Sequence, residues 1–208
     1  MNPVAVTRRP EPTAISTPSA RTCRADEELR AIAASWRTIA TNNHLSPTIR
    51  ATYRTVAQRL EQETTATGTR PCPCQHDQDA TQPGQHIATH LTRVATNITT
   101  INSGHNNAEL ITDLLDRADI HRTADTLRRL ATAQPRLRID PTHIAVTPLL
   151  DDADIEATLR SPSAVDLGTA VVHWSTTLIN LHEPPTTSNV LLGLTPNNHL
   201  VRLHTPTP

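Results

Sequence analysis

AELITDLLDRADIHRTADTLRRLATAQ, residues 108–134, is the stretch on which the predicted fold depends. Its apolar residues recur at steps of three and four in two sets, and each set is typical of the buried face of a helix. Arg117-Ala118-Asp119 separates the sets, and Asp119 is a suitable N-cap for a second helix. We therefore expect a helix, a tight break and a second helix that ends before Pro135. The two sets are Leu110, Ile111, Leu114 and Leu115, then Ile120, Ala124, Leu127, Leu130 and Ala131.

The segment that follows predicts a β-hairpin. Leu137 and Ile139 alternate with Arg136 and Arg138, as in a strand with one solvated face, and a second run follows at residues 143–146. Asp140-Pro141-Thr142 between them is a turn signal. A further helix is expected upstream, from about His86 to Asn102, although its Thr and Ile content leaves a strand after Val94 as an alternative.

This order of elements over residues 86–147 resembles a winged helix-turn-helix. The resemblance implies that the second helix of the pair lies in the DNA major groove and that the hairpin, the wing, contacts the backbone. Asp125 falls among the positions expected to be exposed, where it would repel phosphates. Residues 84–148 hold seven Arg and six acids, so their net charge is only +1. The implied DNA-binding residues are His121, Arg122, Thr123, Thr126 and Arg129 on the helix and Arg136, Arg138 and His143 on the wing.

The flanking residues complete a predicted α+β fold that is mainly α with β-hairpins. Residues 1–24 are rich in Pro, Thr, Ser and Arg, which is typical of a disordered tail. Residues 25–64 predict an αα-hairpin whose apolar faces pack within the chain or form a homodimer through residues 26–63. Residues 65–85 form a polar linker, and residues 86–148 form the winged-helix-like unit. Residues 149–208 predict a short helix at 151–160, a longer one from Ser163 to about Leu181, and a closing hairpin across Pro196-Asn197-Asn198. That second set of helices and hairpin predicts either a tandem winged helix or a second hairpin of one mixed sheet.

A second cluster of side chains suggests a metal site. Cys72 and Cys74, followed by His86 and His90, stand close to the ligand order of a two-Cys, two-His zinc finger. The Cys pair is one residue closer than such fingers allow, and the stretch between the pairs lacks apolar residues for a small core. One alternative is a structural zinc ion that ties the linker to the helix expected from about His86 to Asn102. The other is two thiols that bind no metal.

The amino-acid composition excludes several classes of enzyme and gives no indication of a membrane protein. The chain has no Lys, which excludes Walker-type and Schiff-base chemistry, and its five Gly are scattered singly. We find no catalytic signature, and no apolar run approaches the ~20 residues of a membrane span. The net charge is −1. We therefore expect a soluble, cytoplasmic, non-catalytic protein that binds DNA and regulates transcription, with a protein–protein adaptor as the alternative.

Overall fold

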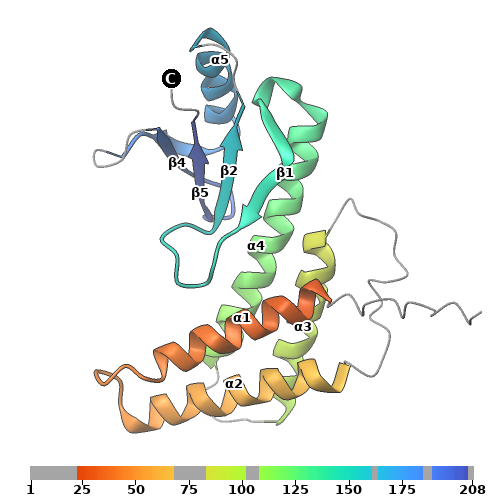
Figure 1. Cartoon of the computed structure of the whole chain (residues 1–208), viewed down its shortest axis with the longest axis vertical. Helices are drawn as coiled ribbons and strands as arrows, with labels where there is room; N and C mark the ends of the chain where they lie inside the picture. The colour runs from red at the N-terminus through yellow and green to blue at the C-terminus, as the bar shows by residue number, and fades with distance from the viewer. Residues whose placement is uncertain (1–22, 68–82, 102–107, 161–163, 185–188, 206–208) are drawn as a thin grey trace, which may run out of the picture.

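The computed structural model describes residues 23–67, 83–101, 108–160, 164–184 and 189–205, and it confirms the α+β class (Figure 1). Three helices precede a long fourth one, and a five-stranded mixed sheet with one further helix follows. The helices are α1 (Arg24–Ile39), α2 (Pro47–Thr67), α3 (Pro83–Ile101), α4 (Ala108–Ala133), the short 3-10 helix η3 (Pro135–Leu137) and α5 (Ala164–Ser175). The strands are β1 (Ile139–Val146), β2 (Ile155–Leu159), β3 (Ile179–His182), β4 (Val190–Leu194) and β5 (Leu200–His204).

The helix break expected at residues 117–119 is wrong, because α4 is continuous from Ala108 to Ala133. Its two apolar sets belong to two different cores. Leu110, Leu114 and Ala118 face a core made with α1, α2 and α3, here called the helical core. The later set, from Ile120 to Ala131, faces a core made with the sheet and α5, here called the sheet core. The apolar face therefore shifts where the helix passes from one core to the other, and the chain contains neither Gly nor Pro there to end it.

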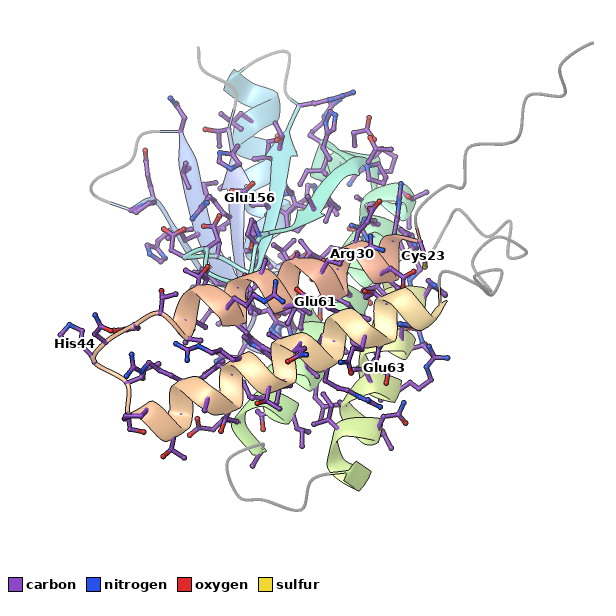
Figure 2. All side chains as sticks on the ribbon, turned by 60° about the horizontal axis from the view of Figure 1, so that its bottom comes forward. Cys23, Arg30, His44, Glu61, Glu63 and Glu156 are labelled. Carbon is purple, nitrogen blue, oxygen red and sulfur yellow. The ribbon has the colours of Figure 1, made fainter. Side chains whose placement is uncertain are left out.

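The first two helices lie side by side and bury their apolar stripes inside the chain (Figures 1 and 2). Leu29 and Trp36 of α1 and Leu60 of α2 are fully buried in the helical core. Glu61 of α2 faces α1, where its carboxylate binds the Arg37 guanidinium. The stripe predicted for a homodimer through residues 26–63 is thus covered by α3 and α4 of the same chain.

The sheet has the strand order β1-β2-β5-β4-β3, in which only the β2–β5 pair is parallel. The hairpin expected across residues 140–142 is wrong, since β1 runs through them and pairs with β2. Asp140 Oδ1 accepts hydrogen bonds from the Thr142 amide at 2.9 Å and the Thr142 hydroxyl at 2.6 Å. This local turn makes an irregularity between Ile139 and Ile144 in one strand and does not reverse the chain.

Two further elements of the C-terminal part differ from the prediction. The expected short helix at 151–160 is instead β2, whose Ile155, Ala157 and Leu159 point into the sheet core at every second position. The expected long helix ends at Ser175, and Leu178 and Leu181 reach the sheet core from the following turn and β3. The closing hairpin, β4 with β5, is confirmed, so the strands form one mixed sheet. Among the described residues, no helix is long and apolar enough to cross a membrane.

Candidate nucleic-acid interface

The end of the molecule opposite α1 and α2 carries a group of exposed basic side chains. There the C-terminal end of α4, the short helix η3, the start of β1 and the end of β2 meet (Figure 1). Between Thr126 and Leu150 the sequence contains a single acid, Asp140. We call this group the basic end, and its members are Arg129, Arg136, Arg138, His143 and Arg160, all exposed.

Arg160 and Asp140 connect the two strands at the basic end. The Arg160 amide donates to the Arg138 carbonyl at 2.6 Å, which continues the β1–β2 pairing by one residue. The Arg160 guanidinium lies 3.2 Å from Asp140 Oδ2 and 3.2 Å from His143 Nδ1. The two Thr142 hydrogen bonds, aided by the Arg160 and His143 charges, lower the pKa of Asp140. The basic end thus holds four exposed arginines, and Asp140 is the acid that ion-pairs with one of them, Arg160.

A buried tryptophan holds η3 in place beneath the basic end. Trp174 of α5 is fully buried, and its indole Nε1 donates to the Leu137 carbonyl at 3.0 Å. Leu137 is also fully buried, so it anchors the backbone of its two neighbours, Arg136 and Arg138. Arg138 adopts the left-handed conformation with φ 54°, which ends η3 and starts β1. Arg136 and Arg138 are therefore presented by a backbone that the sheet core fixes.

The predicted recognition helix is only partly available to a ligand. Thr126 and Arg129 are exposed, as expected. The predictions for His121 and Thr123 are wrong, because both are buried where α4 packs against its neighbours. Arg122 is half-buried, and its guanidinium donates to Thr92 Oγ1 at 3.1 Å and lies 3.6 Å from Asp119. The second half of α4 thus presents a narrow outward strip, because α3 and β1 occupy its other sides.

Asp125 was expected to be exposed, and the structure places it in the interior. The residue is 3 % exposed, and Oδ2 accepts a hydrogen bond from the Gln85 amide at 2.7 Å, which caps the start of α3. Oδ1 accepts from Arg128 Nη1 at 2.6 Å. Arg128 in turn donates two hydrogen bonds to the Ile144 carbonyl on the outer edge of β1. Asp125 therefore repels no ligand at the surface, and Arg128 stabilises the packing of α4 against β1.

Arg160 is the member of the basic end that sequence reasoning missed. Residues 151–160 were expected to be helical, which separated Arg160 from the wing residues. The alternation of Ile155, Ala157 and Leu159 was a usable signal for a strand. Only the pairing of β2 with β1 brings Arg160 next to Arg138, and that pairing is a long-range contact.

A buried ionic group joins α1 to the middle of α4. Arg117 Nε donates to Glu28 Oε1 at 2.5 Å, and Arg117 Nη2 donates to the Thr147 carbonyl at 2.5 Å. His121 Nε2 lies 3.2 Å from the same Glu28 oxygen, an ion-pair distance without hydrogen-bond geometry. Burial alone would raise the pKa of Glu28, but His121 and Arg117 outweigh it and the pKa is lowered. This group lies beneath the surface and positions the two cores relative to each other.

The predicted zinc ligands are only partly described. Cys72 and Cys74 lie outside the described residues. His86 and His90 lie on α3, where His86 Nε2 is 3.7 Å from the thiol of Cys23 and His90 Nε2 is 3.9 Å from Asp26 Oδ1. Cys23 stands at the start of α1 (Figure 2). Burial is the main cause that lowers the pKa of His90. Within the described part of the chain, no three His, Cys, Asp or Glu side chains form a group that could hold a metal ion.

The chain was compared with known proteins at the level of families, sequences and structures. No family model, no curated protein and no solved structure matches it.

Proposed function

We propose that this protein binds DNA without catalysis and that the basic end contacts the phosphates. One observation carries the proposal: four exposed arginines gather at one end of a chain whose net charge is −1. A local cluster of cations on a nearly neutral protein is the arrangement that phosphate binding requires, because affinity grows with the number of phosphates neutralised. Arg guanidinium groups also bind phosphate oxygens in a bidentate manner.

The proposed contact differs from that of a winged helix, which inserts its recognition helix into the DNA major groove. The narrow outward strip of α4 offers Thr126 and Arg129, whereas His121 and Thr123 are buried. The basic end begins in the last turns of α4, at Arg129, and extends to both strands of the β1–β2 pair. Phosphate contact by the whole basic end, and not insertion of α4 into the major groove, is therefore the mode that these exposures support.

The test compares two variants with equal changes in charge. In the first, Arg136, Arg138 and Arg160 are all changed to Gln. In the control, Arg37, Arg54 and Arg59 on α1 and α2 are changed to Gln. Binding to a short fluorescent duplex of random sequence is measured by anisotropy at about 50 mM salt. We expect the first variant to lose at least about tenfold in affinity and the control to change by less than about threefold, since each phosphate contact adds to binding.

Two results would overturn the proposal. The first is a folded wild-type protein that does not bind the duplex. The second is an equal loss of affinity in both variants, which would place the contact outside the basic end. The first result would leave a protein-binding role as the remaining prediction, with the exposed apolar side chains of Val172 and Ile179 as its starting point. The second result would keep DNA binding but remove the basic end as its site.

A further inference from the structure

The Trp, Tyr and Phe residues of the chain are few, and none of them belongs to the basic end. The sequence has two Trp, one Tyr and no Phe. Trp36 and Trp174 are fully buried. Tyr53 is half-buried against the helical core, with its ring edge-on to Trp36 at a centroid distance of 6.3 Å. The basic end therefore has no Trp, Tyr or Phe ring to stack on a nucleic-acid base, and both ring nitrogens of its His143 lie within 3.3 Å of the Arg160 guanidinium.

This arrangement bears on which form of nucleic acid the basic end would bind. Proteins that bind single strands obtain much of their affinity from stacking bases on aromatic side chains, about 1–3 kcal/mol per base. Proteins that read RNA loops also stack unpaired bases on aromatic rings or Arg planes. The guanidinium of Arg160 is already held by two side chains, Asp140 and His143. The basic end thus offers mainly charge and lacks Trp, Tyr and Phe platforms for bases.

The rigidity of the basic end points in the same direction. Trp174 fixes the carbonyl of Leu137, the left-handed Arg138 follows directly, and the Arg160 amide is bonded to the Arg138 carbonyl. A fixed backbone that presents arginines matches a ligand whose phosphates are already held in rows. A double helix provides such rows, with one charge per about 1.7 Å of its axis. A flexible single strand would have to be ordered first, at an entropic cost.

We infer that the ligand of the basic end is double-stranded nucleic acid, bound through its phosphates and in preference to single strands. This inference rests on the proposed function and narrows its ligand. The exposed polar residues of α4 are too few to read a series of bases, since His121 and Thr123 are buried and Arg122 is bonded to Thr92. Binding should therefore depend little on base sequence.

The experiment measures the affinity of the full chain for a duplex and for each of its separated strands under identical salt. We expect the duplex to bind at least about tenfold more tightly than either strand, because only it combines high charge density with order. A duplex of unrelated sequence should bind within about threefold of the first, since phosphates carry no sequence information directly. Intrinsic tryptophan fluorescence should stay unchanged on binding, because both Trp side chains are fully buried.

The outcomes separate the two proposals. A single strand that binds as tightly as the duplex, or that quenches tryptophan fluorescence, would overturn the inference while the proposed nucleic-acid function stands. If neither form binds, the proposed function fails and this inference fails with it. Tighter binding to the duplex that is lost in the Arg136, Arg138 and Arg160 variant but kept in the control variant would support both.

Discussion

Replacing Arg117 with Met tests whether the buried ionic group holds the two cores together. Arg117 is 5 % exposed, and it supplies donors to both Glu28 on α1 and the carbonyl of Thr147 before β2. Met fills a similar volume but leaves His121 as the one remaining side chain among those that lower the pKa of Glu28. Breaking a buried pair by removing one partner costs about 3–5 kcal/mol.

The expected loss lies at the lower end of that range, about 3 kcal/mol, because the Glu28 side chain keeps 16 % of its surface exposed. A loss of that size is a large part of the 5–15 kcal/mol that is typical of a folded domain. With a urea m-value of about 1–3 kcal/mol/M, it moves the unfolding midpoint down by about 1–3 M. Tryptophan fluorescence follows both cores, since Trp36 lies in the helical core and Trp174 in the sheet core.

Two further variants make the measurement decisive. Arg59→Met removes an arginine of an exposed ion pair with Glu63 on α2, and it should cost no more than about 1 kcal/mol. The double variant Glu28→Leu, Arg117→Met removes both buried charges and should recover most of the lost stability. A loss below about 1 kcal/mol for Arg117→Met, or a double variant as unstable as the single one, would refute the reasoning.

The remaining predictions concern two separate glycines, Gly84 and Gly168, and the dependence of stability on pH. A Cβ on Gly84 would lie 2.3 Å from the His121 carbonyl oxygen, so Gly84→Ala should cost about 1–3 kcal/mol by forcing α3 away from α4. Gly168 on α5 has nothing within 4 Å of a Cβ, so Gly168→Ala should raise the free energy of unfolding by about 0.5–1 kcal/mol. Thermal unfolding measures both variants, and midpoints that shift in the same direction in the two would contradict this pair of predictions. Because folding lowers the pKa of Glu28 from 4.5, its stabilisation is present above that pH and is lost as the pH falls below it. Glu28→Gln should therefore flatten the fall in the free energy of unfolding on the acid side, and an unchanged pH profile in urea titrations would be evidence against it.

Local patterns in the sequence are sufficient to predict the helices and strands that pack against a single core. The helix stripes around Leu29, Leu60 and Leu91 and the closing hairpin across Asn198 follow from periodicity and turn residues within a few positions. The α+β class follows from these elements as well.

Long-range contacts determine the parts that could not be predicted. A shift in the apolar face of α4 near Ala118 is the signal of a helix break and equally of a helix that passes between two cores, and only the tertiary arrangement distinguishes them. Asp140-Pro141-Thr142 closes a local turn in either a hairpin or an irregular strand, and the β1–β2 pairing selects the strand. The same pairing brings Arg160 into the basic end, and burial of Asp125 beneath α3 removes the acid expected to oppose binding.

The salt dependence of duplex binding tests the role of the basic end most directly. The logarithm of the binding constant falls with the logarithm of salt concentration by about 0.9 per phosphate neutralised, so four arginines predict a slope of up to about −3.6. Changing Arg136, Arg138 and Arg160 to Gln should make the slope shallower by up to about 2.7, whereas the Arg37, Arg54 and Arg59 control should leave it unchanged. A slope near zero in the wild-type protein, or an equal slope in wild type and the Arg136, Arg138 and Arg160 variant, would contradict phosphate binding by the basic end.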